Sequence, residues 1–113
     1  MSKISSSHRK ALEKIVANPS KFGFQDIIKS SAEENLFHRG SVVVQPDVTL
    51  TSREGIVYII EYKSNGDVEI MKRAKDQLEK AVWWYGKYSD IPPEKIRTII
   101  ISGKDPKYKE LLR

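Results

Sequence analysis

Two carboxylates and a lysine lie within a stretch that otherwise has the pattern of a β-hairpin. In QPDVTLTSREGIVYIIEYKSN (45–65), Asp47 falls in the first predicted strand, and Glu61 and Lys63 fall in the second. Hard cations such as Mg²⁺ prefer carboxylate oxygens. A bound divalent cation lowers the pKa of water and stabilises the charge that grows on phosphorus. A cation held by two acids beside a lysine therefore indicates phosphodiester hydrolysis.

The register of the predicted hairpin brings these three side chains to one face of the sheet. Arg53-Glu54-Gly55 fits a three-residue hairpin loop, in which glycine takes the left-handed third position. Counting outward from this loop places Asp47 opposite Glu61, and directly opposed residues share a face. Lys63 shares the same face because side chains alternate along a strand. The three groups are therefore expected to converge on one patch.

Two acids that face each other across a hairpin repel, so a positive charge between them is expected. Lys63 supplies one charge, and an ordinary cross-strand ion pair is the alternative interpretation. A divalent cation supplies more charge, and the alignment of the acids on consecutive strands favours this metal site. The opposite face is expected to be core, because it carries only apolar and aromatic side chains, namely Val42, Val44, Val48 and Leu50 against Ile56, Tyr58, Ile60 and Tyr62.

The surrounding sequence predicts an α/β fold in a single domain, 1–113. Asn18-Pro19 ends a first helix, because the residue before proline avoids the α region, and Asp67 can cap a long second helix. The apolar stretch IRTIII predicts a strand that is buried on both faces. Residues 31–35 (SAEEN) fit either a loop or one helical turn. The chain is thus expected to form a mixed sheet flanked by helices, in the order helix 8–17, strand 25–29, strands 42–51 and 56–64, helix 68–88, strand 96–101 and a final helix that begins at Pro106 with Asp105 as its N-cap.

Composition narrows the class of protein. The net charge of +5 and the pI near 9.4 favour a polyanionic partner such as nucleic acid. The chain has no cysteine, which excludes a disulfide framework and a thiolate metal site. His8 and His38 have no partners at metal-binding spacing and are interpreted as ordinary surface or satisfied residues. Neither a membrane-spanning run nor a secretion signal is visible, so a cytoplasmic protein without a membrane partner is expected.

Pro46-Asp47 and Glu61-Tyr62-Lys63 resemble the motif of the PD-(D/E)xK nuclease superfamily, which includes many restriction endonucleases and the archaeal Holliday-junction resolvases. LEKIVANPSKFG (12–23) and DQLEKAVWWY (76–85) resemble helices in the nuclease domain of archaeal NucS-type endonucleases. The resemblance implies a restriction-endonuclease-like core in the order α-β-β-β-α-β, and an endonuclease that hydrolyses DNA with Mg²⁺ or Mn²⁺. Two alternatives stay open: a nucleic-acid-binding module on the same fold that does not cut, and a small basic structural protein.

The resemblance also implies roles for the hairpin residues. Asp47 and Glu61 would be metal ligands, and the backbone carbonyl of Tyr62 would be a further ligand. Lys63 would orient or activate the attacking water and stabilise the transition state. DNA is the implied substrate and RNA the less favoured one, while the shape of the DNA stays open.

Outside the hairpin, the family tends to place an acidic residue on the first helix. Glu13 is the acid in that helix and is preferred for this role, and Glu33 and Glu34 compete for it if SAEEN is helical. Gln77 matches a glutamine that follows the motif in related nucleases, where it would touch the bound water or a phosphate. A solvated helix position is the alternative for Gln77.

The long second helix predicts both DNA contacts and dimerisation. Its basic side chains could contact phosphates or form a solvated face. The adjacent aromatic residues 83–85 span too wide an arc for one core, so at least one tryptophan is expected at an interface. A homodimer is favoured because two sites are the simplest means of cutting both strands, and a separate recognition subunit is a further candidate partner. The basic residues are Lys72, Arg73, Lys75 and Lys80.

Overall fold

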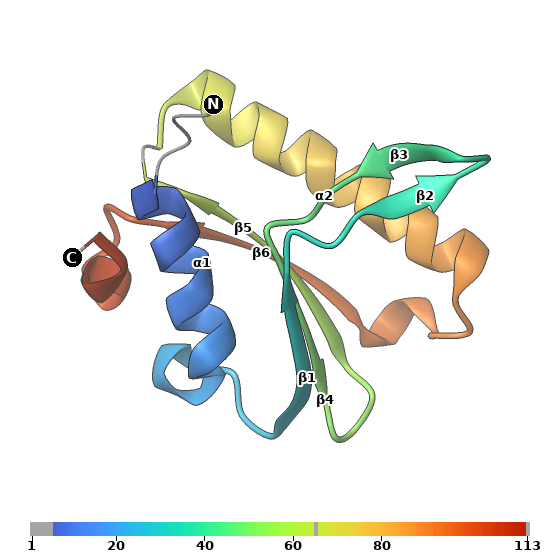
Figure 1. Ribbon diagram of the computed structural model, residues 1–113, viewed down its shortest axis with the longest axis horizontal. Helices are drawn as coiled ribbons and strands as arrows, with labels where there is room; N and C mark the ends of the chain where they lie inside the picture. The colour runs from blue at the N-terminus through green and yellow to red at the C-terminus, as the bar shows by residue number, and fades with distance from the viewer. Residues whose placement is uncertain (1–5, 65, 113) are drawn as a thin grey trace.

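The computed structural model describes residues 6–64 and 66–112 as an α/β fold (Figure 1). Its main elements are α1 (Ser6–Ala17), β1 (Ile27–Ala32), β4 (Val48–Ser52), β5 (Val57–Lys63), α2 (Val68–Tyr88) and β6 (Ile96–Ser102). The four strands form one sheet in the order β1-β4-β5-β6. β1, β4 and β5 are antiparallel neighbours, and β6 runs parallel to β5. The expected mixed sheet flanked by helices is thereby confirmed.

The β4–β5 hairpin has the predicted register. Val48 pairs with Ile60, so the next position outward places Asp47 opposite Glu61. Gly55 has φ +88° in the connecting turn, a left-handed conformation that glycine adopts without steric cost. The register that positions the two acids therefore follows from a loop that was recognisable in the sequence.

The two long helices cover opposite faces of the sheet (Figure 1). α1 packs Leu12 and Ile15 into a core cluster with residues of β4 and β5, among them Leu50. α2 packs Leu78 and Ala81 into a second cluster on the other face. No helix of the described residues is long and apolar enough to cross a membrane.

α2 has the predicted bounds and the predicted cap. The Asp67 carboxylate accepts a hydrogen bond from the Glu69 N–H at 2.8 Å, and the helix extends from Val68 to Tyr88. One side chain thus fixes where the element that faces the hairpin begins.

The predicted strand 42–51 is in fact two strands. β3 (Ser41–Val44) pairs with β2 (Leu36–His38) in a separate two-stranded sheet, and pairing in the main sheet resumes at β4. Pro46 lies at the break and lacks the backbone N–H that a continuous ladder needs. As a result Val44 packs in the cluster on the α2 side, and Val42 is 48% exposed. The expectation that both belong to the same core face as Leu50 is wrong.

The C-terminal part of the chain also differs from expectation. β6 is an edge strand with Arg97 and Thr98 exposed, and not a strand buried on both faces, because an apolar run alone does not reveal how many neighbours cover it. The final segment is the 3₁₀ element η3 (Pro106–Leu112), interrupted at Tyr108, rather than an α-helix. Further short 3₁₀ turns are η1 (Pro19–Phe22) and η2 (Pro93–Lys95). Residues 31–35 are no helical turn, since β1 continues to Ala32.

Candidate active site

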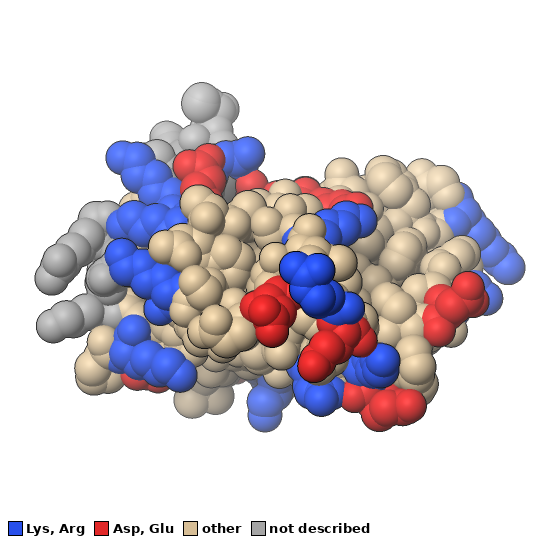
Figure 2. Space-filling view, turned by 90° about the horizontal axis from the view of Figure 1, so that it is seen from below, with Lys and Arg blue, Asp and Glu red and all other residues tan. Residues whose placement is uncertain are grey.

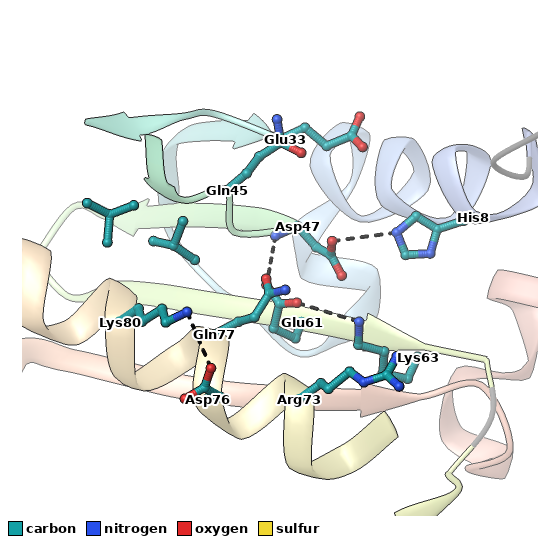
Figure 3. A pocket seen from close by; sticks show the side chains of 12 residues that line it. His8, Glu33, Gln45, Asp47, Glu61, Lys63, Arg73, Asp76, Gln77 and Lys80 are labelled. Carbon is teal, nitrogen blue, oxygen red and sulfur yellow. Dashed lines mark hydrogen bonds and ion pairs between the residues drawn. The ribbon is translucent and has the colours of Figure 1, made fainter. Parts of the chain in front are cut away.

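Asp47, Glu61 and Lys63 of the hairpin line one cavity of about 410 Å³ (Figure 3). Asp47 enters it from the bend before β4, and Glu61 and Lys63 enter it from the end of β5. The first turn of α1, the segment around β3 and one side of α2 supply the remaining walls. Charges of both signs meet there, with Glu33, Asp47, Glu61 and Asp76 as acids and His8, Lys63, Arg73 and Lys80 as basic residues.

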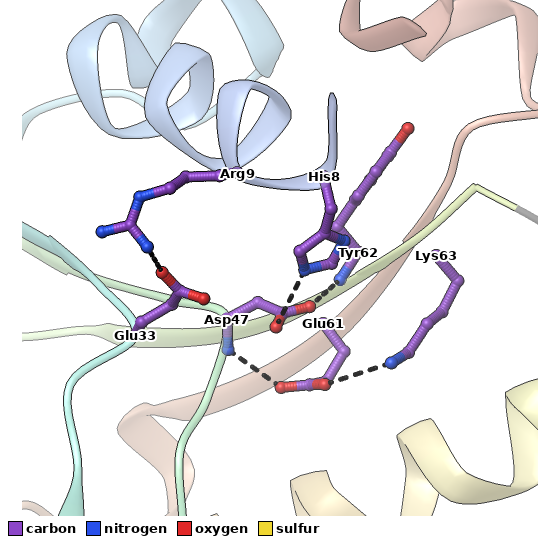
Figure 4. A network of polar contacts seen from close by, with 7 residues as sticks. All are labelled: His8, Arg9, Glu33, Asp47, Glu61, Tyr62 and Lys63. Atoms are coloured by element: carbon purple, nitrogen blue, oxygen red, sulfur yellow. Dashed lines mark hydrogen bonds and ion pairs between the residues drawn. The ribbon is translucent and has the colours of Figure 1, made fainter. Parts of the chain in front are cut away.

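The carboxylates of Asp47 and Glu61 each accept a hydrogen bond from a backbone N–H on the opposite side of the hairpin (Figure 4). The backbone N–H of Asp47 donates to Glu61 Oε2 at 3.0 Å. The backbone N–H of Tyr62 donates to Asp47 Oδ2 at 2.8 Å. Lys63 Nζ lies 3.8 Å from the other oxygen of Glu61, Oε1. Both carboxylates therefore keep their orientation only while the hairpin keeps its register.

Glu61 is a buried acid with a strongly raised pKa. Its side chain is 2% exposed. Burial raises the pKa of Glu61 to about 7, and the negative charge of Asp47 is the second cause. The Asp47 N–H and the Lys63 ammonium oppose this shift but do not cancel it. A cation at this position would favour the ionised form, because opposite charge lowers the pKa of a carboxyl.

This raised pKa predicts how the stability of the metal-free protein depends on pH. The pKa of Glu61 lies above its ordinary value of 4.5, so between about pH 5 and pH 8 the folded chain binds more protons than the unfolded chain, and the free energy of unfolding falls as pH rises. Glu61→Gln should remove about 2–3 kcal/mol of that fall. The raised pKa of His8 adds a loss of the same sign above its ordinary value of 6.5, which this variant retains.

Urea unfolding at a series of pH values, with a chelator present, measures the slope. Glu54→Gln is the matched control because Glu54 lies exposed in the hairpin turn at the other end of the strands. The explanation fails if Glu61→Gln and Glu54→Gln have the same slope as the wild type.

His8 is a member of the site that the sequence did not reveal. Its Nε2 atom lies 3.5 Å from Asp47 Oδ1, and this hydrogen bond raises the pKa of His8 against the opposing effect of burial. The His8 ring also lies 5.8 Å from the ring of Tyr62, centroid to centroid. His8 precedes Leu12 and Ile15 by four and seven positions, so the helical period alone could have directed it towards the sheet.

The structure brings Glu33, and not Glu13, to the cavity. Glu13 is 64% exposed and pairs with Arg9 at 3.6 Å, because it lies about 140° around α1 from His8. Glu33 follows the end of β1 and is also ion-paired with Arg9. Glu34 is exposed and does not line the cavity. The structure thus places Glu33 at the cavity and Glu13 away from it, and the role of the additional acid stays a prediction.

α2 presents some of its predicted contact residues to the cavity and turns others away. Arg73, Gln77 and Lys80 line the cavity, one turn after another. Lys72 and Lys75 are exposed and do not line it. The helix thus offers an amide and two cations beside the acids, at a spacing of three or four residues that keeps them on one face.

The donor set fits a hard divalent cation in its chemistry. Asp47 and Glu61 supply carboxylate oxygens to the cavity, and a bound cation would stabilise the negative charge of Glu61 that burial disfavours. Among residues 6–64 and 66–112, no group of three or more His, Cys, Asp or Glu side chains is arranged to hold a metal. Mg²⁺ commonly uses only one or two carboxylates and completes its shell with water and substrate phosphate.

The architecture is a mixed four-stranded sheet between two helices, with the acids at the hairpin. The chain is similar to the crystal structure of a repair endonuclease from Pyrococcus abyssi, with a TM-score of 0.59 and 18% sequence identity. The match covers 99% of this chain and 45% of that chain, so this chain spans less than half of the matched protein. No protein-family model matches the chain, and no curated protein matches it in sequence. The comparison therefore shows that this chain shares its fold with that endonuclease.

Proposed function

We propose that the chain is a divalent-metal-dependent endonuclease domain that hydrolyses phosphodiester bonds in DNA. The observation that carries this proposal is the convergence of Asp47, Glu61 and Lys63 in one cavity, within a fold shared with a repair endonuclease. The net charge of +5 supports a polyanionic substrate. In Figure 2 several Lys and Arg side chains lie together at the left end of the molecule, and others are spread over this face among Asp and Glu side chains.

Asp47, Glu61 and the backbone carbonyl of Tyr62 would hold Mg²⁺ or Mn²⁺. When bound, the cation supplies an acidified water and neutralises charge that develops on phosphorus. The chain's own contribution is to fix both carboxylates by backbone N–H groups, so that neither has to reorganise during the reaction.

On this proposal, Lys63 acts on the reacting groups rather than on the fold. Its ammonium lies 3.8 Å from Glu61 Oε1 and remains partly exposed to the cavity. From there it can orient the attacking water and stabilise the charge of the transition state. Gln77 can donate to the water or to a phosphate oxygen, and Arg73 and Lys80 can contact phosphates along the strand.

A plasmid-nicking assay with Mg²⁺, Mn²⁺ or a chelator tests the proposed activity. We expect relaxed and linear DNA with either metal and supercoiled DNA with the chelator. A protein that retards the plasmid in a gel yet leaves it supercoiled with both metals would instead be the non-cutting nucleic-acid-binding module. Parallel incubation with a labelled RNA of the same sequence tests the preference for DNA.

We also propose a homodimer formed through an aromatic patch on β2, β3 and α2. The patch consists of Phe37, Val42, Trp83 and Tyr88, which are 52%, 48%, 48% and 46% exposed. Trp84 is half-buried and donates through Nε1 to the Phe37 carbonyl at 2.8 Å. Of the two adjacent tryptophans, Trp83 is thus the one that faces outward, and aromatic residues are enriched at interfaces.

Light scattering of the wild type should give the mass of two chains, and Trp83→Lys should give the mass of one. Ile28→Lys on β1 is the matched control, because Ile28 is 59% exposed and lies outside the patch. A wild type that stays monomeric in concentrated solution rules the dimer out.

The single domain 1–113 would, on this proposal, be a cutting unit that obtains its target from a partner. A separate recognition subunit is a further proposed partner. The cytoplasmic location stays a prediction from the sequence.

A further inference from the structure

A second cavity of about 240 Å³ adjoins the candidate active site. It lies between the first turn of α1, the end of β5 and the first turns of α2. Its walls share His8, Lys63 and Arg73 with the larger cavity and add Tyr62, Ser64 and Ile70. The two cavities therefore meet along a border of three basic side chains.

The two cavities differ in charge. Four carboxylates line the larger cavity, whereas none of the described residues that line the smaller cavity is acidic. Figure 3 shows His8, Lys63 and Arg73 at the same end of the larger cavity, away from Lys80 and Asp76. A ligand in the smaller cavity would meet only positive charge, a hydroxyl group and an apolar wall.

We propose that the smaller cavity binds a phosphate group of the substrate strand next to the bond that is cut. Two phosphate oxygens can accept from the guanidinium of Arg73 in a bidentate geometry, and a phosphate oxygen can also accept from the ammonium of Lys63. The Ser64 hydroxyl adds a neutral donor, and Ile70 can contact the sugar. This subsite rests on the proposed nuclease function for its meaning, but its occupancy needs no metal and no cleavage.

Binding of thymidine 5′-phosphate, compared with thymidine, tests the subsite by calorimetry in the presence of a chelator. The nucleotide should bind to the wild type and the nucleoside should not. Arg73→Ala should weaken the nucleotide about tenfold or more, because a hydrogen bond to a charged group is lost, and Arg73→Lys should recover part of the affinity. Arg53→Ala is the matched control, since Arg53 is exposed in the turn at the far end of the hairpin.

The idea is overturned if Arg73→Ala and Arg53→Ala bind the nucleotide equally well, or if thymidine binds as tightly as its phosphate. Oligonucleotides with and without a 5′-phosphate identify the source of the group. Stronger binding of the phosphorylated strand, abolished by Arg73→Ala, assigns a terminal phosphate. Equal binding of both strands, weakened alike by Arg73→Ala, assigns an internal diester. A protein that shows this binding but nicks no plasmid would retain the subsite and lose the proposed nuclease activity.

Discussion

Lys63→Ala is expected to lower the rate of DNA cleavage by about 10²–10³-fold while leaving metal affinity unchanged or slightly higher. The loss in rate follows because the ammonium acts on the water and on the charge of the transition state, and one such electrostatic contact typically contributes this much. The metal affinity is kept because Lys63 is itself a cation 3.8 Å from Glu61 Oε1 and repels a second cation there. The two effects together separate a catalytic lysine from a simple ion-pair partner.

Two measurements on the same protein check this result: nicking rate at saturating Mg²⁺, and Mg²⁺ affinity by calorimetry. The Lys63 charge lowers the pKa of Glu61, so Lys63→Ala raises that pKa and lets protons compete with the metal near neutral pH. Calorimetry therefore belongs at about pH 8.5, above the Glu61 pKa. Lys29→Ala, an exposed lysine on β1, is the control. Cleavage by Lys63→Ala at nearly the wild-type rate would remove the main support for the nuclease proposal.

Glu61→Ala is expected to abolish cleavage by a different route, because it removes a metal ligand. Mg²⁺ affinity should fall on the order of 100-fold, since even residues that only support a metal ligand can contribute a factor of this size. The substitution leaves Asp47 as the only carboxylate of the pair. The fold should survive, because the substitution removes an acid whose burial and proximity to Asp47 disfavour its charge. DNA affinity measured with Ca²⁺ should stay near that of the wild type, since phosphate contacts elsewhere carry most of it.

Calorimetry with Mg²⁺ and thermal unfolding with a chelator distinguish this route from unfolding. Glu54→Ala in the hairpin turn is the matched control for the loss of one acid. The assignment of Glu61 as a ligand is wrong if Glu61→Ala retains the Mg²⁺ affinity of the wild type.

The hairpin and the long helix could be predicted because local chemistry specifies them. Gly55 sets the turn, and the turn sets the register that aligns Asp47 with Glu61. Asp67 caps α2 at its first turn. In each case a side chain or a backbone conformation a few residues away decides the outcome, so the sequence contains the necessary information.

The parts that escaped prediction depend on contacts between distant segments. β2 and β3 are short, and the turn between them has Arg39 and Gly40 in left-handed conformations, with φ of 53° and 82°. The pattern of apolar residues does not predict such a turn. His8 and Asp47 are 39 positions apart in the sequence and meet only when α1 packs on the sheet. The sequence favours Glu13 because it is the acid of the first helix, but its position around the helix directs it away from the cavity.

The site exists only in the folded hairpin, because Asp47 and Glu61 are oriented by backbone groups on opposite sides of it. Each carboxylate accepts a hydrogen bond from a backbone N–H across the hairpin. When the two strands are not paired, the two acids therefore move independently. A cation would then recognise the native hairpin alone and shift the folding equilibrium towards it by RT ln(1 + [L]/Kd). A slip of the hairpin by one residue would turn one acid to the other face of the sheet. A misfolded or partly folded chain would lack these two hydrogen bonds and would thus not form a working active site.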